Sequence, residues 1–200
     1  MTPRAAQVSI TALLLVSLAA SAAAEPPAGG PKLRTSHFAR GIFTEGHIGA
    51  TVFLGDTGKV TRPGPAFALR LGYDLFSWLS LYAHAQGSFH EATPPPPPEN
   101  QHFQSYVTGA GLRLQLSIGR LGIFAHGSSG LLFFSSNVLD RTGITTPQVR
   151  STFAFGGGGG LDWHTWNRHY SFGLTADYLL GPSLANTSAL TTTLYLRYAH

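Results

Sequence analysis

Few residues in this 200-residue chain have the types and spacing that catalysis requires. The best pair is His126 and Ser128, because residues two apart on a β-strand share one face and a histidine can activate a serine hydroxyl. The chain has nine histidines and no cysteine, and no spacing among them matches a zinc signature. We therefore expect neither a metal site nor a cofactor.

A second group of candidates consists of ionisable side chains at alternate positions of eight strand-like segments. Its members are Glu45, Arg70, Asp74, His84, Arg113, His126, Asp162, Asp177 and Arg197. If they share a narrow interior, charges of opposite sign should pair, because an unpaired buried charge is costly. This favours a plugged, hydrogen-bonded interior, and the alternative is a gated path for protons or ions.

The segments that must position these side chains alternate apolar and polar residues with period two. They cover residues 40–54, 66–76, 78–90, 103–118, 121–134, 151–163, 169–180 and 189–198. Each reaches the ~9–11 residues with which a tilted strand crosses a bilayer. Long connections near 55–65, 91–102, 135–150 and 181–188 alternate with short ones, as in outer-membrane barrels. We predict an all-β fold, an eight-stranded antiparallel up-and-down transmembrane β-barrel with both ends in the periplasm.

Composition favours lipid over water as the surroundings of the apolar face. Only 11% of residues are charged, and 24 are glycine. The polar face of the segments carries Gly, Ser, Thr and His, whereas the rival fold, a soluble β-sandwich or lipocalin-like barrel, would show water many Lys and Glu. The net charge of +4 comes without a dense basic cluster, so we expect no nucleic-acid partner.

The N-terminal residues are typical of an export signal. Residues 1–24 combine Arg4, an apolar run over 8–20 and three small residues, Ala22–Ala24, which predicts a cleaved signal peptide rather than an anchor helix. Residues 25–37 are rich in Pro and Gly and are predicted to form a flexible periplasmic tail. The barrel domain is expected over residues 38–200.

Two motifs resemble small OmpA- and OmpX-like outer-membrane barrels. Residues 72–76 and 78–81 (GYDLF and WLSL) are similar to their strand–turn–strand, and the alternating Leu194, Leu196 and Tyr198 are similar to their C-terminal assembly signal. That signal usually ends on the aromatic residue, whereas Ala199 and His200 follow here. The resemblance implies a bacterial outer-membrane location and contact with lipid and the barrel-assembly machinery. It is specific for architecture and not for function.

The same resemblance bears on the His126–Ser128 pair. Lipid A deacylase barrels carry a His-x-Ser pair at the outer end of the penultimate strand, followed by Asn. At that place this chain has Asp177, Tyr178, Leu179 and Leu180. Its own pair lies in the middle of another segment and points inward by parity. We expect no enzyme activity.

Three surface features complete the prediction. Aromatic residues near strand ends indicate a girdle at the membrane interface, and they are Phe76, Trp78, Phe133, Phe134, Trp163, Trp166 and Tyr170. Five prolines in the second outer loop, Pro94, Pro95, Pro96, Pro97 and Pro98, form a stiff strip that is either a spacer or a docking site. The run Gly156–Gly160 predicts a close approach of strands, a bulge, or a contact between barrels.

The favoured functional hypothesis is a non-enzymatic structural or interaction subunit of an envelope assembly, of the adhesion or gliding-motility type. It would contact other envelope proteins through its outer loops and tail. A narrow channel for small or apolar solutes is the alternative, and a lipid-modifying barrel enzyme is the second alternative.

Overall fold

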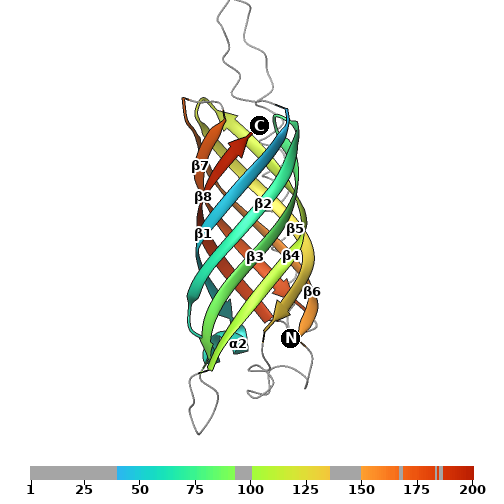
Figure 1. Cartoon of the computed structure of the whole chain (residues 1–200), viewed down its shortest axis with the longest axis vertical. Helices are drawn as coiled ribbons and strands as arrows, with labels where there is room; N and C mark the ends of the chain where they lie inside the picture. Colours follow the sequence, from blue (N-terminus) through green and yellow to red (C-terminus); the bar gives the residue numbers. More distant parts are fainter. Residues whose placement is uncertain (1–39, 93–100, 136–149, 167–168, 183, 185–186) are drawn as a thin grey trace, which may run out of the picture. The chain divides into compact units, whose positions relative to one another are not determined.

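Eight strands close into one antiparallel barrel (Figure 1). The computed structural model describes residues 40–92, 101–135, 150–166, 169–182, 184 and 187–200. The elements are β1 (Ile42–Leu54), α2 (Gly55–Val60), β2 (Gly64–Phe76), β3 (Leu79–Ala92), β4 (Gln101–Ile118), β5 (Leu121–Phe134), β6 (Ser151–His164), β7 (Tyr170–Gly181) and β8 (Thr187–Ala199). Each strand pairs with its sequence neighbours, and β8 pairs with β1, which confirms the predicted barrel.

Three sequence predictions lie outside the described residues: the signal peptide over 1–24, the tail over 25–37 and the strip Pro94–Pro98. Within the described ranges no helix is long and apolar enough to cross a membrane. The sequence predicts a loop after β1, whereas the first six residues of that connection form the short helix α2.

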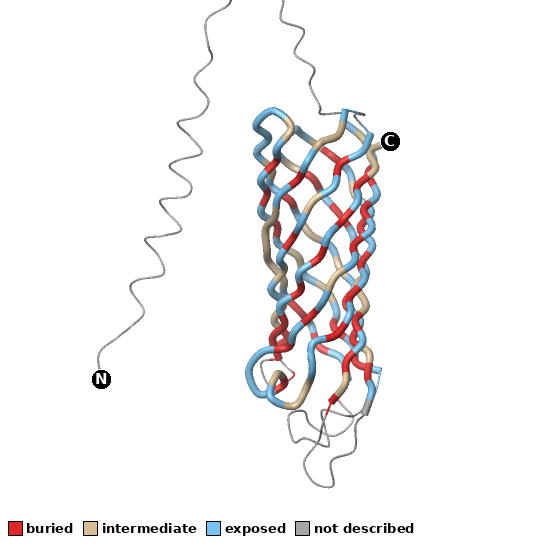
Figure 2. The backbone as a smooth tube through the Cα atoms, turned by 90° about the vertical axis from the view of Figure 1, so that its left-hand side faces the viewer, coloured by how far each residue is buried: buried red, intermediate tan, exposed pale blue. Residues whose placement is uncertain are grey.

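Burial alternates residue by residue along the strands, as the coloured tube in Figure 2 shows. The outward positions are large and apolar, with Leu69 70% exposed, while the inward positions include charged groups such as Glu45, 2% exposed. A soluble barrel has the reverse arrangement. The apolar face therefore meets lipid, and the soluble sandwich is excluded as the fold.

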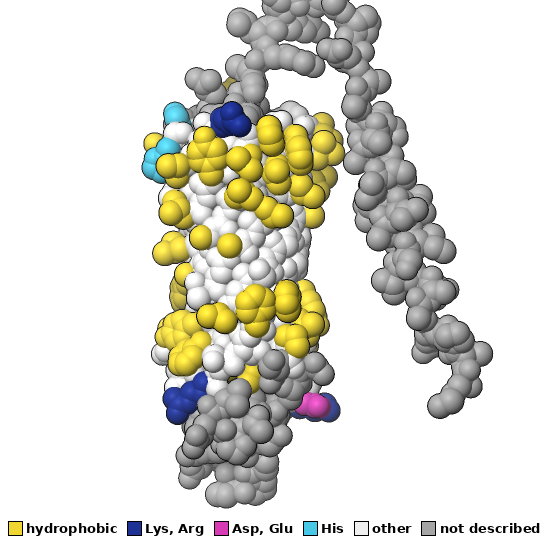
Figure 3. Space-filling model, turned by 90° about the vertical axis from the view of Figure 1, so that its right-hand side faces the viewer, with side chains coloured by type: hydrophobic (Ala, Val, Ile, Leu, Met, Phe, Trp, Pro, Cys, Tyr) yellow, Lys and Arg dark blue, Asp and Glu magenta, His cyan; other side chains and the backbone are white. Residues whose placement is uncertain are grey.

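On the face of the barrel that Figure 3 shows, hydrophobic side chains gather toward both ends, with a stretch between them where few hydrophobic side chains appear. Six of the seven predicted girdle residues are exposed: Phe76, Trp78, Phe133, Trp163, Trp166 and Tyr170. The prediction is wrong for Phe134, which is buried. Because Phe133 points outward, the strand alternation turns Phe134 into the lumen.

Four inward aromatic rings each lie against a glycine of the neighbouring strand. Each pair joins the two strands of one hairpin: Phe43 with Gly72, Tyr82 with Gly111, Phe124 with Gly160, and Tyr195 with Gly173. A Cβ on any of these glycines would come within 2.6 Å of the ring. The rings fill a lumen that in an eight-stranded barrel is only wide enough for side chains.

The run Gly156–Gly160 brings strands close together without a bulge. The register of β6 continues unbroken through it with both β5 and β7. A Cβ on Gly158 would lie 2.2 Å from the Ala176 carbonyl oxygen, and one on Gly160 would lie 2.1 Å from that of Leu174. The prediction of a close approach is confirmed, and the bulge is wrong.

Candidate functional site

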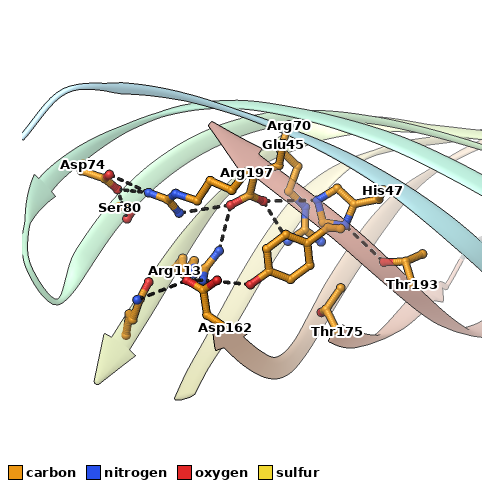
Figure 4. Close-up of polar contacts among 12 residues, drawn as sticks. Glu45, His47, Arg70, Asp74, Ser80, Arg113, Asp162, Thr175, Thr193 and Arg197 are labelled. Atoms are coloured by element: carbon orange, nitrogen blue, oxygen red, sulfur yellow. Dashed lines mark hydrogen bonds and ion pairs between the residues drawn. The ribbon is translucent and has the colours of Figure 1, made fainter. Parts of the chain in front are cut away.

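The lumen holds a buried ionic network centred on Glu45 (Figure 4). Glu45 Oε1 accepts hydrogen bonds from Arg113 Nη1 at 2.8 Å and from Arg197 Nη1 at 3.1 Å. These side chains come from β1, β4 and β8, so they meet across the barrel. The alternation that points each of them inward is the feature that assembles the cluster.

Each arginine also reaches a second carboxylate. Arg197 Nη2 donates to Asp74 Oδ1 at 2.6 Å, and Ser80 Oγ donates to the same oxygen at 2.6 Å. Arg113 Nη2 donates to Asp162 Oδ2 at 3.1 Å. Carboxylates and guanidinium groups thus alternate in one continuous chain across the lumen.

The network continues toward the middle of the barrel. Glu45 Oε2 lies 3.2 Å from His47 Nε2 and 4.0 Å from Arg70 Nη1. Arg70 Nη2 donates to Asp177 at 3.2 Å, and the same carboxylate bonds His126 Nε2. The three arginines therefore face four carboxylates.

The arginines also stack on the rings that cover the glycines. The guanidinium carbon of Arg113 lies 3.7 Å from the Phe124 ring centroid, and that of Arg197 lies 3.8 Å from the Phe43 centroid. Arg70 lies 5.1 Å from the Tyr82 centroid. Such contacts are worth ~2 kcal/mol when desolvated. Ring, guanidinium and carboxylate hold one another in place.

Eight of the nine predicted lumen residues join this network, and His84 does not. His84 points inward beside Tyr82, with ring centroids 5.9 Å apart. Its Nδ1 is buried without a hydrogen-bond partner in the described structure. His47, Ser80 and Thr193, absent from the predicted set, are part of the hydrogen-bonded cluster.

In the His126–Ser128 pair, the histidine is engaged by a carboxylate. His126 Nε2 bonds Asp177, and His126 Nδ1 is buried with no hydrogen-bond partner among the described residues. Ser128 and Tyr82 line the same part of the lumen. A cavity of about 30 Å³ beside Ser128 and His84 has room for roughly one water molecule. Across the described ranges, no group of three or more His, Asp or Glu is arranged to hold a metal ion.

A second barrier, missed by the sequence analysis, fills the lumen at the end with the long connections. The rings of Phe53, Phe103 and Phe134 have centroids 5.8–6.0 Å apart. Leu132 packs with them, and Leu184 enters from the β7–β8 connection. Parity predicts the inward aromatics, whereas nothing local places Leu184. Helix α2 packs near this end, where Thr57 bonds Thr187 at 3.2 Å.

The proposed assembly signal lies on β8 at its seam with β1. Leu194 and Leu196 face lipid, and the Tyr198 ring packs against Tyr170 at 5.0 Å and His200 at 4.7 Å between centroids. Ala199 still pairs with Phe43, so the strand continues past Tyr198.

Comparison with solved structures agrees with this architecture. The chain is similar to neisserial surface protein A, with a TM-score of 0.62 and 10% identity, over 80% of this chain and 97% of that one. It is also similar to the attachment invasion locus protein Ail of Yersinia pestis, with a TM-score of 0.52 and 15% identity, over 82% of this chain and 100% of that one. The outer-membrane enzyme PagL aligns with a TM-score of 0.46 and 17% identity, over 79% and 99%. No family model and no curated protein sequence matches.

These similarities, at 10–15% identity, establish the fold and not an activity. Together with the lipid-facing exterior and the polar lumen, they define the chain as a small eight-stranded outer-membrane β-barrel. The architecture implied by the resemblance to OmpA- and OmpX-like barrels is confirmed.

Proposed function

We propose that this barrel is a non-enzymatic structural or interaction subunit of an envelope assembly, which acts through its surfaces and not through its lumen. The observation that carries the proposal is the double closure of the lumen. The ionic network fills one level and the aromatic cluster fills another. A barrel filled in this way is suited to anchoring and presenting its outer connections.

The ionic network opposes the channel alternative. A path through it must separate Arg113 or Arg197 from Glu45, and breaking a buried ion pair costs ~3–5 kcal/mol. The aromatic cluster would have to open as well. The cavity near Ser128 has room for roughly one water molecule.

The arrangement of His126 and Ser128 supports the absence of enzyme activity. A serine nucleophile needs its hydroxyl within reach of the base, and here His126 Nε2 bonds Asp177. Both residues point into the filled lumen. A lipid substrate on the outside of the barrel has no contact with them.

An adhesion-type role is the form of this function that we favour. The similar protein Ail is an attachment invasion locus protein, and it was solved with a heparin analogue. The described rim at the end with the long connections carries the ion pairs Arg62–Glu91 and Lys59–Asp56, at 3.2 and 2.7 Å. The strip Pro94–Pro98 belongs to the same set of connections in the sequence. A gliding-motility complex would use the same outer surface.

Capture of partners from native envelopes tests the interaction role. The full chain is compared with a variant in which Pro94–Pro98 are replaced by glycine and serine, and with the control Lys59→Gln on α2. We expect the wild type and the control to recover the same envelope partner and the proline variant to lose it. Recovery of no envelope partner by the wild type contradicts the proposal.

A fatty-acid release assay on lipopolysaccharide and phospholipid tests the absence of catalysis. We expect no release by the purified barrel. Release that Ser128→Ala or His126→Ala abolishes would overturn the non-enzymatic assignment.

A further inference from the structure

A groove of about 720 Å³ lies on the lipid-facing exterior, across β1 to β4. Its walls include Ile42, Tyr73, Leu81 and Leu112, which form one cross-strand row, and its floor includes the directly paired Ala83 and Ala110. We call this the β1–β4 groove. The small side chains of the floor beside the large ones of the row make the depression. Its volume falls within the ~300–1,000 Å³ of ligand pockets.

A positively charged side chain, that of Arg40, lies at the periplasmic end of the groove. Arg40, two residues before Ile42, is exposed, and its Nε donates to the Leu75 carbonyl oxygen at 3.1 Å. Its guanidinium carbon lies 5.8 Å from the Phe76 ring centroid, and Phe76 stacks on Trp78 at 5.6 Å with an interplanar angle of 8°. The arrangement therefore places a positive charge and two stacked aromatic rings beside an apolar groove.

The charge of Arg40 has no anionic partner in the described part of the chain. Four acidic side chains on the strands point inward and form ion pairs in the lumen network: Glu45, Asp74, Asp162 and Asp177. The outward acids Asp56 and Glu91 lie at the opposite end of the barrel and pair with Lys59 and Arg62. A ligand that complements this end of the groove is therefore anionic.

The spacing matches a lipid. Ala83 pairs with Leu71, four residues along β2 from Leu75, which is ~13 Å along the strand at ~3.3 Å per residue. At a strand tilt of about 40° this is roughly 10 Å of depth in the membrane. One leaflet of the hydrocarbon core is about 15 Å deep, half of the ~30 Å total. The floor thus lies within the leaflet depth that an acyl chain occupies when its headgroup is level with Arg40.

We propose that the β1–β4 groove binds an anionic phospholipid, with an acyl chain on the Ala83–Ala110 floor and the phosphate at Arg40. An uncharged apolar segment of a partner would fill the floor and leave the guanidinium without an anion. The charge at the end of the groove is what favours the lipid. This binding site is independent of whether the outer connections bind a partner.

Quenching of Trp78 by brominated lipids tests the proposal. In the background Trp163→Phe with Trp166→Phe, Trp78 is the one tryptophan left in the chain. The barrel is folded into vesicles that contain brominated phosphatidylglycerol or brominated phosphatidylcholine at equal mole fraction. We expect the anionic lipid to bind beside Trp78 about fivefold more tightly, which corresponds to the ~1 kcal/mol that one basic residue contributes at an anionic lipid surface.

Matched variants locate the preference. Arg40→Gln should abolish it, whereas Arg120→Gln, which removes an arginine beside position 166 at another part of the rim, should retain it. Ala110→Leu fills the floor and should weaken the preference, whereas Ala125→Leu on the lipid face of β5 should not. Folding of every variant is checked by electrophoretic mobility. Equal quenching by the two lipids, or a preference that survives Arg40→Gln, overturns the proposal.

Discussion

Replacing Arg113 by methionine removes the guanidinium that links the two halves of the lumen network. It takes from Glu45 the bond of 2.8 Å and from Asp162 the bond of 3.1 Å, and it ends the contact with the Phe124 ring. Glu45 keeps Arg197 and His47, while Asp162 keeps a 3.4 Å bond from Gln115. Removing one partner of a buried pair costs ~3–5 kcal/mol. Methionine fills part of the space, so we expect Arg113→Met to lower the free energy of unfolding by about 3–5 kcal/mol.

The assay is equilibrium unfolding by urea in lipid vesicles, followed by tryptophan fluorescence. The control is Arg120→Met, which makes the same substitution at an arginine that stacks on Trp166 at the rim. A contact of this kind at an exposed site is worth ~0.5–1 kcal/mol. The double variant Glu45→Gln with Arg113→Met should lose less than the two single losses added, because the two residues interact directly. A loss at Arg113 no larger than at Arg120 would refute the account of the lumen as a coupled ionic network.

The remaining predictions concern the rings, the aromatic cluster and helix α2. Gly160→Ala should lower the free energy of unfolding by ~1–3 kcal/mol, because its Cβ would meet the Phe124 ring at 2.6 Å and the Leu174 carbonyl oxygen at 2.1 Å; the matched Gly127→Ala, whose Cβ meets nothing nearer than 3.9 Å, should be close to neutral in the same urea titration. Phe53→Ala should lower the free energy of unfolding by ~3–5 kcal/mol through the cavity it leaves. Planar-bilayer recordings of this variant should still show no steady conductance, because the ionic network remains. Open-channel current in this variant would contradict closure at two levels. Lys59→Gln should raise the pKa of the Asp56 carboxyl toward its ordinary value, because the hydrogen bond and charge of Lys59 hold that pKa down, and an unchanged pKa in NMR titration would contradict the pairing.

Much of the barrel follows from the period of its sequence. Alternation alone orients Glu45, Arg113 and Arg197 inward, since strand side chains alternate between the two faces. The choice of partner does not follow from it. Glu45 and Arg70 are direct cross-strand neighbours, yet the shortest bond of Glu45 is to Arg113, 68 residues away. That choice depends on strand tilt and side-chain conformation, which no local pattern encodes.

The aromatic cluster shows a second kind of limit. Parity predicts Phe53 and Phe134 inside, whereas the position of Phe134 at a strand end favours the girdle, and the structure follows parity. Leu184 belongs to a connection without period, so its burial depends on how that connection folds back over the lumen. Charged residues at alternate positions are enough to predict the ionic network, whereas the aromatic cluster can be recognised only in the three-dimensional fold.

Planar-bilayer recording from the purified wild-type barrel tests the central claim most directly. Because the ionic network and the aromatic cluster both close the lumen, we predict no steady conductance across the range of applied voltage. A steady, voltage-independent current through the wild-type protein would contradict a closed lumen and favour the channel.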